Sequence, residues 1–288
     1  MPADHRYTFL ESLLFPSTSL NEQKLQQRLK GKTVLITGAS YGIGESLAYK
    51  LAATGAHLIL IARTEKKLSL IKKDIEAQGG TATIFPTDLT KTEQVEQLSV
   101  QLLALPSSID IVINNAGKSI RRPVKESLDR FHDFTRTIGV NYLGPVQLIL
   151  SLIPVLEQNK GHIINVSAIN VLLAPAPHWA AYQASKSAFD QWFRSVSPEL
   201  QLAGIATTSV YLPLVRTRMI APTPAYDNMP AMSAEHVARI ICKCIINRNR
   251  SYAPWWLIFG QLGSVIFRKP WERLSTYYLK RNSNKDNA

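Results

Sequence analysis

The sequence predicts an α/β fold with a doubly wound parallel sheet, and two features of its 288 residues carry that prediction. Short apolar runs rich in β-branched residues, typical of strands buried on both faces, alternate with stretches in which apolar residues recur at helical spacing. Polar residues or glycines follow most of these runs, as at the ligand-binding edge of a parallel sheet. We therefore expect a single α/β domain whose ligands bind at the carboxyl ends of its strands.

The main domain is expected over residues 31–250, between a helical arm at residues 1–30 and a C-terminal extension at residues 251–288. Leucine and phenylalanine alternate with polar residues in the arm, which we expect to pack on the main domain; a membrane or a partner protein is the alternative contact. Within the main domain we expect strands at residues 33–37, 57–62, 82–86, 109–113, 162–166 and 207–211, and helices after Gly44, at 68–77, at 95–103, at about 128–157 and around 182–186.

The chain carries a formal net charge of +12, and 45% of its residues are hydrophobic, enough for a substantial core. A basic surface of this kind suits anionic lipid, a phosphorylated cofactor or a phosphorylated substrate; an ordinary solvated surface is the alternative. Nucleic acid is not expected as a partner, because neither zinc-finger spacing nor a basic helical arm occurs.

The two cysteines favour a reducing compartment. Cys242 and Cys244 stand two positions apart in a helical pattern, so they face different directions, cannot pair and lack partners for a metal site. Residues 1–9 show no signal-peptide pattern, and no apolar run is long enough to predict a transmembrane helix. We therefore expect a cytoplasmic protein without a bound metal.

A glycine cluster with the spacing G-x-x-x-G-x-G, from Gly38 to Gly44, connects the first strand to the first helix. Glycines here let the backbone approach a pyrophosphate, while the helix N-terminus offers N–H donors and a partial positive charge. Arg63 follows the second strand, where an acidic residue would hold a ribose 2′-hydroxyl, and its guanidinium suits a 2′-phosphate instead. The cofactor expected is NADP(H); if Arg63 is only a solvated charge, NAD(H) is the alternative.

Tyr182 and Lys186 are four positions apart and therefore share one face of a helix, one turn from each other. An ammonium beside a phenol favours the phenolate, so we expect the pKa of Tyr182 to fall from about 10 toward the working pH. Tyr182 would then donate a proton to a carbonyl oxygen or accept one from a hydroxyl.

Together these motifs resemble the short-chain dehydrogenase/reductase family over about residues 31–248. The resemblance rests on Thr37-Gly38-Ala39-Ser40-Tyr41-Gly42-Ile43-Gly44, Asn114-Asn115-Ala116-Gly117, Asn141, Ser167 and Tyr182-Gln183-Ala184-Ser185-Lys186. It implies a Rossmann fold and an NAD(P)-dependent oxidoreductase, active as a homo-oligomer (a dimer or a tetramer). In it Tyr182 is the general acid/base, Lys186 lowers its pKa and binds the nicotinamide ribose, and Asn141 anchors a proton-relay water.

The same resemblance assigns cofactor contacts at the ends of the strands. Asp88 would lie by the adenine and Asn115 would line the cofactor. Thr217 would bind the carboxamide, just before a substrate lid at Met219–Met229. The implied cofactor-binding residues are Gly38, Ser40, Tyr41, Gly42, Ile43, Gly44, Arg63, Asp88, Leu89, Asn115, Ala116, Gly117, Tyr182, Lys186, Pro213, Val215 and Thr217.

The chain departs from the family's pattern after the fifth strand. The family has two adjacent hydroxyl residues there, the second of which steadies the substrate carbonyl, whereas this chain has Ser167-Ala168 and a loop to Tyr182 that is one residue longer. We expect Ser167 to take the role; the alternative is a weakened oxyanion contact. Tyr41 is a second departure, since a small or basic residue is commoner there.

Further strings resemble bacterial fatty acyl-CoA reductases of this family. They are Gly117-Lys118-Ser119-Ile120-Arg121-Arg122, Asp129-Arg130-Phe131-His132-Asp133-Phe134, Tyr211-Leu212-Pro213-Leu214-Val215-Arg216-Thr217 and Met219-Ile220-Ala221-Pro222-Thr223. This implies NADPH-dependent reduction of a lipid-like carbonyl compound, a fatty acyl-CoA or fatty aldehyde, by hydride transfer with Tyr182 as general acid. A ketone, 3-oxoacyl or steroid-like reductase is the alternative. A non-catalytic NADP-binding regulatory or scaffold protein is a further one, favoured by Ala168 but opposed by the intact Tyr182–Lys186 pair.

The C-terminal extension contains an apolar stretch, residues 253–267, with Trp255, Trp256 and Phe259, followed by the basic Arg268 and Lys269. It is too short to span a bilayer, but tryptophan with basic flanks suits a membrane interface. Peripheral contact with the inner face of a membrane is one expectation. The other is a segment that covers the substrate pocket or makes a subunit contact.

Overall fold

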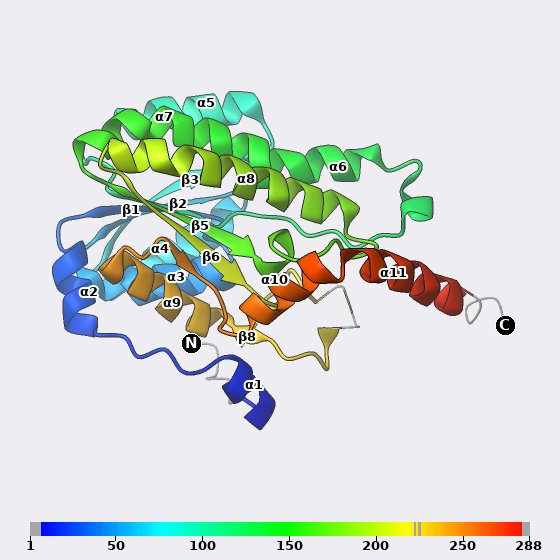
Figure 1. Ribbon diagram of the computed structural model, residues 1–288. Coiled ribbons are helices and arrows are strands. Elements are labelled where there is room, and N and C mark those ends of the chain that lie inside the picture. The colour runs from blue at the N-terminus through cyan, green and yellow to red at the C-terminus, as the bar shows by residue number, and fades with distance from the viewer. Residues whose placement is uncertain (1–6, 222, 224–225, 284–288) are drawn as a thin grey trace.

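The computed structural model describes residues 7–221, 223 and 226–283, and in this part of the chain seven parallel strands form the central sheet (Figure 1). The strand order is β3-β2-β1-β4-β5-β6-β9, so the direction of winding reverses between β1 and β4, the point where ligands of such sheets bind. The strands are β1 (Thr33–Thr37), β2 (His57–Ala62), β3 (Thr81–Pro86), β4 (Ile111–Asn114), β5 (His162–Ala168), β6 (Ala206–Leu212) and β9 (Ser251–Tyr252), and a separate pair is formed by β7 (Val215–Arg216) and β8 (Met232–Ser233).

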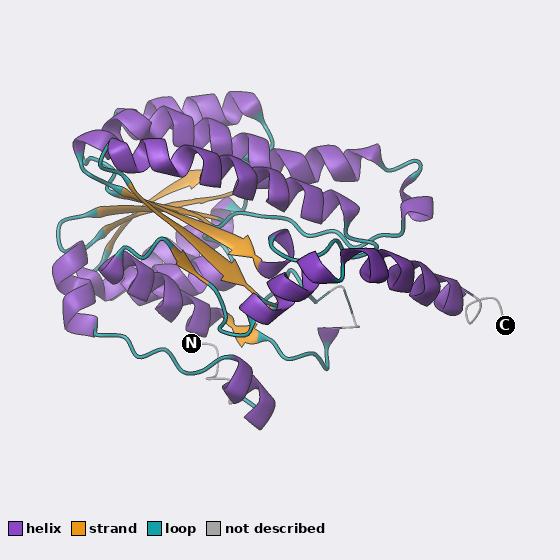
Figure 2. Ribbon diagram, viewed as in Figure 1, coloured by secondary structure: helices purple, strands orange, loops and turns teal. Residues whose placement is uncertain are grey.

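Helices cover both faces of the sheet, which confirms the doubly wound α/β prediction (Figure 2). One face carries α2 (Glu22–Leu29), α3 (Gly42–Leu51), α4 (Glu65–Ala77) and α9 (Ala234–Asn247), and the other carries α5 (Thr92–Leu103), α6 (Phe131–Ile138), α7 (Gly144–Gln158) and α8 (Ala180–Leu202). Outside these layers lie α1 (Phe9–Leu14), α10 (Leu257–Ile266) and α11 (Arg268–Ser283), and single turns of helix occur at Ala52–Thr54, Val124–Ser127 and Ile169–Val171.

The first strand explains why the apolar runs are continuous. All five residues of β1 are buried. Val34 and Ile36 pack in the core beneath α3 and α9, whereas Leu35 packs in the core beneath α5 and α7. Because successive side chains of a strand point to opposite faces, a strand covered on both sides needs apolar residues at every position.

The helical stretch expected at about 128–157 is interrupted in the structure. Between α6 and α7 lies a π-helical turn, Gly139–Leu143, and Asn141 stands in its middle. A Cβ on Gly144 would overlap the carbonyl oxygen of Leu89, so a glycine lets the helix pass close to the end of β3. Irregular turns of this kind commonly re-aim one side chain at a functional site.

This same stretch, Phe131–Gln158, is long and apolar enough to cross a membrane by length and composition, contrary to the expectation that the sequence holds no such run. In the fold it is a layer of the α/β domain. Leu148, Leu152 and Leu156 of α7 are buried in the core shared with α5 and the sheet. Packing in this core accounts for the buried apolar residues of the stretch.

The N-terminal arm is fastened to the main domain by a buried carboxylate. Glu11 of α1 forms an ion pair with Arg216 of β7 and accepts a hydrogen bond of 3.1 Å from the backbone N–H of Ala231. Burial acts to raise the pKa of Glu11, but hydrogen bonds from Arg216, from the backbone of Thr8 and from that of Ala231 outweigh it and hold the pKa at about 2. The arm therefore packs on the domain, as expected from its apolar residues.

Replacing Glu11 by Gln is expected to destabilise the fold by about 2–4 kcal/mol, because Arg216 loses its buried partner while remaining partly solvated. Thermal melts measure the change. Since the native pKa lies below 4.5, the stabilisation by Glu11 is complete above pH 4.5 and is lost as the pH falls toward 2. Glu22→Gln, which removes the exposed partner of Lys50, is the control and should cost less than about 1 kcal/mol. Equal melting temperatures for the two variants would contradict this account.

Candidate active site

The turn between β1 and α3 leaves no room for side chains. Gly38 and Gly42 have φ angles of +68° and +59°, a region that other residues rarely adopt. A Cβ on Gly38 would lie 2.8 Å from the Cα of Ala116, and a Cβ on Gly42 would lie 2.9 Å from the Cγ2 of Thr217. A Cβ on Gly44 would overlap the carbonyl oxygen of Gly38. The turn is thus a backbone cradle at a helix N-terminus, which suits a pyrophosphate.

Asn115 holds this cradle in place. Its Nδ2 donates to the carbonyl oxygens of Thr37 (3.0 Å) and Gly38 (3.3 Å), and its backbone N–H donates to Thr37 Oγ1 at 3.0 Å. The backbone N–H of Ala116 donates to the same hydroxyl at 3.0 Å. The side-chain amide of Asn115, predicted to line the cofactor, therefore joins the end of β4 to the glycine turn by hydrogen bonds.

The predicted cofactor-binding residues meet at one edge of the sheet, where the parallel strands end. Asp88 is already engaged there, because its Oδ1 accepts hydrogen bonds from the backbone N–H and the hydroxyl of Thr90. After β1 come Ser40, Tyr41 and Ile43, after β2 Arg63, after β3 Asp88 and Leu89, after β4 Asn115, Ala116 and Gly117, and after β6 Pro213, Val215 and Thr217.

Cationic side chains gather near this edge. Arg63 is exposed at the end of β2, and the Arg218 guanidinium lies 4.1 Å from the centre of the Tyr41 ring, with Lys67 at 5.8 Å. Burial lowers the pKa of Lys118, and the positive charges of Arg136 and Arg63 lower it further. A phosphate bound here would relieve the repulsion between Lys118 and these two arginines. Lys118 and Arg218 were not predicted as site residues. Lys118 lies within one of the strings that resemble fatty acyl-CoA reductases and Arg218 follows Thr217, but neither carries a signature of its own.

Tyr182 and Lys186 lie one turn apart on α8, as predicted, and Lys186 is buried. Its ammonium donates to the carbonyl oxygen of Val166 on β5 at 3.1 Å, and Gly117 lies close enough that a Cβ there would be 3.5 Å from Nζ. Burial lowers the pKa of Lys186 to about 8, against the opposing effect of Asp190 one turn further along. A cation is thus held at the end of β5, beside the strand-end loop of β4.

The predicted fall in the pKa of Tyr182 is wrong for this structure. Burial raises the pKa to about 12, and the nearby Tyr226 adds to the rise. The sequence argument assumed that the Lys186 ammonium faces the phenol. Instead it bonds to the backbone of Val166, and no hydrogen bond joins it to Tyr182 within the described residues. Desolvation of the phenolate therefore dominates.

Asn141 uses its side chain to hold the site together. Its Oδ1 accepts from the backbone N–H of Lys118, and its Nδ2 donates to the Lys118 carbonyl and to Ser185 Oγ, all at 2.9 Å. Both amide N–H bonds are therefore committed, so the side chain is not available as the donor of a relay water. It positions the loop after β4 against the helix that carries Tyr182.

Two buried polar atoms at the end of β5 have no hydrogen-bond partner in the described part of the chain. They are Ser167 Oγ and Asn170 Oδ1. A buried hydroxyl without a partner is costly unless a ligand completes it, so Ser167 meets the condition for its predicted role beside the carbonyl. Ala168, which follows it, can offer only backbone. Asn170 was missed, because an isolated Asn in a loop gives no signal in the sequence.

Aromatic rings lie beside Tyr182. Trp179 meets Tyr182 edge-on at 5.8 Å and stacks on Tyr226 at 6.0 Å. Tyr226 belongs to the predicted lid at Met219–Met229, of which residues 222, 224 and 225 lie outside the described residues. An apolar wall of this kind excludes water from the phenol and favours an apolar substrate group.

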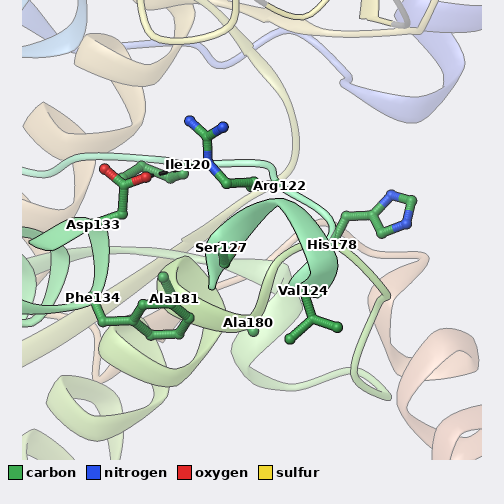
Figure 3. Close-up of a pocket in the computed structure, with 9 residues that line it drawn as sticks. All are labelled: Ile120, Arg122, Val124, Ser127, Asp133, Phe134, His178, Ala180 and Ala181. Carbon is green, nitrogen blue, oxygen red and sulfur yellow. Dashed lines mark hydrogen bonds and ion pairs between the residues drawn. The ribbon is translucent and has the colours of Figure 1, made fainter. Parts of the chain in front are cut away.

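A small pocket adjoins the start of α8, beside this wall (Figure 3). Arg122 and Arg130 both donate through Nε to Asp133, at 3.2 and 3.0 Å, and the backbone N–H of Arg122 donates to the carbonyl of His178. The pocket is lined by Ile120, Arg122, Val124, Ser127, Asp133, Phe134, His178, Ala180 and Ala181. Among the described residues, no group of three or more His, Cys, Asp or Glu side chains is placed to hold a metal ion.

A family model described as short chain dehydrogenase matches residues 32–227, a stretch that includes the glycine turn, Asn141, Tyr182 and Lys186. The chain belongs to this family. It is therefore an NAD(P)-dependent short-chain oxidoreductase, as the resemblance of its motifs implied.

This short-chain dehydrogenase is 47% identical over 247 residues to a fatty acyl-CoA reductase of Acinetobacter baylyi, covering 85% of this chain and 82% of the relative. Among solved structures it resembles a metagenomic short-chain oxidoreductase in complex with NADP (TM-score 0.67, 27% identity, 79% of this chain and 96% of the other). It also resembles a 3-oxoacyl (acyl-carrier-protein) reductase from Agrobacterium tumefaciens with NADP bound (TM-score 0.68, 26% identity, 78% and 90%).

Three observations fit a nicotinamide dinucleotide at this edge of the short-chain dehydrogenase. The glycine cradle excludes side chains where a pyrophosphate would lie. Cations stand around it, including Arg63 at the end of β2. The buried hydroxyl of Ser167, at the end of β5, has no partner among the described residues, and it lies beside Val166, whose carbonyl accepts from the Lys186 ammonium.

Proposed function

We propose that this enzyme is an NADPH-dependent reductase of a lipid-like carbonyl compound, a fatty acyl-CoA or a fatty aldehyde. The observation that carries the proposal is a Tyr182–Lys186 pair beside the aromatic wall of Trp179, in a chain 47% identical to a reductase named for fatty acyl-CoA. NADPH rather than NADH is favoured by Arg63 at the end of β2, and NADP is bound in the related solved structures.

The chain's own residues divide the work of holding the cofactor. The turn from Gly38 to Gly44 and the N-terminus of α3 would hold the pyrophosphate, and Arg63 the 2′-phosphate. Lys186 would reach the nicotinamide ribose and Thr217 the carboxamide. When bound, the nicotinamide supplies the hydride that the carbonyl carbon receives.

Tyr182 supplies the proton that the carbonyl oxygen needs in this reduction. A fatty aldehyde that gains the hydride and this proton becomes the alcohol, whereas an acyl-CoA becomes a hemithioacetal, which releases the CoA thiol to give the aldehyde. With a pKa of about 12 it keeps its proton at neutral pH, which is the form that can donate. The Lys186 ammonium, one helical turn away, donates to the carbonyl oxygen of Val166 and would serve the cofactor rather than the phenol. Ser167 Oγ would donate a hydrogen bond to the same oxygen, which would give this buried hydroxyl the partner that it lacks among the described residues.

A 3-oxoacyl reductase is the second candidate, favoured by the likeness to the enzyme from Agrobacterium tumefaciens. The two differ in the bond that is reduced: a thioester or aldehyde carbonyl at the chain end in one, and an internal ketone in the other. Oxidation of NADPH with a panel of acyl thioesters, fatty aldehydes, 3-oxoacyl thioesters and ketones, followed by product analysis, separates them. Consumption with ketones alone would replace the first candidate by the second. Binding of NADPH without turnover of any substrate would indicate a non-catalytic protein.

The cofactor preference depends on one exposed charge. Arg63→Asp is expected to weaken NADPH binding roughly ten- to hundredfold and to shift preference toward NADH, because a charge-assisted contact becomes a repulsive one. Fluorescence titration with both cofactors measures it. Lys66→Asp, at an exposed position of α4, is the matched charge change and should leave the NADPH/NADH ratio unaltered. If both variants bind NADPH like the parent enzyme, Arg63 is a surface charge and the NADP preference fails.

We further propose a cytoplasmic homo-oligomer, a dimer or a tetramer, with peripheral contact to the inner face of a membrane through its C-terminal extension. The two cysteines are buried as free thiols, which suits a reducing compartment. Size-exclusion chromatography with light scattering tests the oligomer, and fractionation of cells tests the location. A monomer, or an enzyme found outside the cytoplasm, would contradict the corresponding part.

A further inference from the structure

The helix α10 presents its apolar side to solvent. Its large exposed side chains are 55–78% exposed and recur at the spacing i, i+1, i+4, i+7, i+8, which is one face of a helix. They are Ile258, Phe259, Leu262, Val265 and Ile266. Such a stripe normally faces the core of a soluble protein, so α10 is oriented the opposite way.

Small and polar residues of α10 face the domain instead. Ser264 Oγ accepts a hydrogen bond of 3.0 Å from the backbone N–H of Ala174, and a Cβ on Gly260 would lie 3.0 Å from Leu173 Cδ2. Leu257 at the start of α10 is buried. These contacts fix which side of the helix is turned inward, so the exposed stripe is a property of the docked helix.

The next helix, α11, continues the exposed apolar stripe and adds positive charge. Trp271 Nε1 donates to the carbonyl of Pro175 at 3.0 Å, which places α11 beside the same loop (Figure 1). Residues 268–280 contain one acidic residue, Glu272, and four basic ones: Arg268, Lys269, Arg273 and Lys280. The exposed apolar residues are Phe267, between the two helices, and Trp271, Leu274, Tyr277 and Tyr278 of α11.

The N-terminal helix α1 joins the same surface, although it lies more than 240 residues earlier in the chain. Trp255 Nε1 donates to the carbonyl of Leu13 at 3.2 Å, and Trp256 Nε1 donates to that of Leu14 at 3.3 Å. Phe9 is 89% exposed, and Leu10 and Leu13 are also exposed at the spacing i, i+1, i+4. The start of α10 and the end of α1 are therefore in contact, and both offer apolar side chains to solvent.

We infer that α1, α10 and α11 form one composite face that docks on an anionic lipid bilayer, with the loop at residues 172–178 opening onto it. Large apolar side chains, exposed tryptophans and a basic flank are the combination that a bilayer interface accommodates, whereas a water-exposed stripe of this extent is unfavourable. The excess of positive charge over residues 268–280 selects an anionic lipid surface.

The docking face also adjoins the active site. Leu173, Ala174 and Pro175 contact α10 or α11, and the same loop leads into Trp179 beside Tyr182. Docking would therefore bring the approach to Tyr182 to the bilayer surface, so that an acyl chain need not cross water. This substrate half of the inference rests on the proposed lipid substrate, whereas the docking itself does not.

Vesicle sedimentation of the full-length enzyme tests the docking without any substrate. The vesicles contain phosphatidylcholine alone or phosphatidylcholine with phosphatidylglycerol. We expect binding to the anionic vesicles that weakens with salt, and a loss of roughly tenfold or more in the pairs Phe259→Ser/Val265→Ser and Phe9→Ser/Leu13→Ser. Leu103→Ser/Leu202→Ser, at exposed leucines near the C-terminal ends of α5 and α8, is the matched control and should bind like the parent.

The contribution of charge is tested separately by the triple variant Arg268→Gln/Lys269→Gln/Arg273→Gln, which should lose the salt-dependent part of vesicle binding. The matched control is Lys66→Gln/Lys73→Gln/Lys91→Gln, which should keep it. Thermal melts show that each variant is folded, and turnover of a water-soluble short-chain substrate should be unchanged in all of them. Because this readout is independent of vesicle binding, failure of the proposed reaction and failure of docking are distinguishable.

Three outcomes overturn the inference. The first is a parent enzyme that binds neither kind of vesicle. Vesicle binding that survives Phe9→Ser/Leu13→Ser would remove α1 from the face. An oligomer that dissociates in Phe259→Ser/Val265→Ser, without vesicle binding by the parent, would assign the face to a second copy of the chain.

Discussion

Tyr182→Phe is expected to lower turnover by about a hundred- to ten-thousandfold, the range that a positioned proton donor contributes. Only a hydroxyl is removed, so NADPH affinity and melting temperature should stay close to those of the parent enzyme. Steady-state oxidation of NADPH with the best substrate of the panel, beside a cofactor titration, measures both quantities.

Tyr226→Phe is the matched control for Tyr182→Phe. It removes a second hydroxyl from the same aromatic group while keeping the ring that stacks on Trp179. Near-parental turnover is expected for Tyr226→Phe. Near-parental turnover for Tyr182→Phe would mean that another group protonates the carbonyl oxygen.

Gly44→Ala is expected to weaken NADPH binding roughly tenfold or more and to lower the melting temperature. The new Cβ would overlap the Gly38 carbonyl oxygen and approach Asn115 Nδ2 to 2.8 Å, so the turn must open and the hydrogen bonds that hold it are strained. Overpacking of a well-packed site costs about 1–3 kcal/mol. Cofactor titration and a thermal melt record the two effects.

Gly263→Ala provides the control, because a Cβ on Gly263 in α10 meets nothing within 4 Å. It should leave cofactor affinity unchanged. It should not lower the melting temperature either, because alanine suits a helix better than glycine. Unaltered NADPH affinity in Gly44→Ala would show that the cradle does not hold the cofactor.

Local patterns in the sequence were sufficient to predict the scaffold. Continuous apolar runs and helical spacing predicted strands at 33–37 and 57–62, and the structure has β1 and β2 at those residues. Such predictions succeed because a strand covered on both faces needs apolar side chains at every position, whatever its neighbours are. The order of motifs likewise predicted a short-chain dehydrogenase, which the family match confirmed.

Side-chain partners in the site could not be predicted in this way. The spacing of Tyr182 and Lys186 placed them on one helix face but did not show which acceptor the Lys186 ammonium donates its hydrogen bond to. In the structure the acceptor is the carbonyl oxygen of Val166 on β5, and burial raises the pKa of Tyr182. Similarly, Asn141 and Asn115 were recognised as motif residues, yet their amides bind backbone groups of neighbouring loops.

The sequence by itself determined the periodicities, the glycine spacing and the composition of the C-terminal extension, because each is local along the chain. Only the tertiary structure decided which groups are desolvated and which segments meet. Glu11 pairs with Arg216, and Trp255 reaches Leu13 across most of the chain length. The apolar stripe of α10 could equally have faced inward; its direction was decided by the contacts of Ser264 and Gly260 with the loop before Tyr182. Burial and long-range contact depend on how the whole chain packs, which no local pattern specifies.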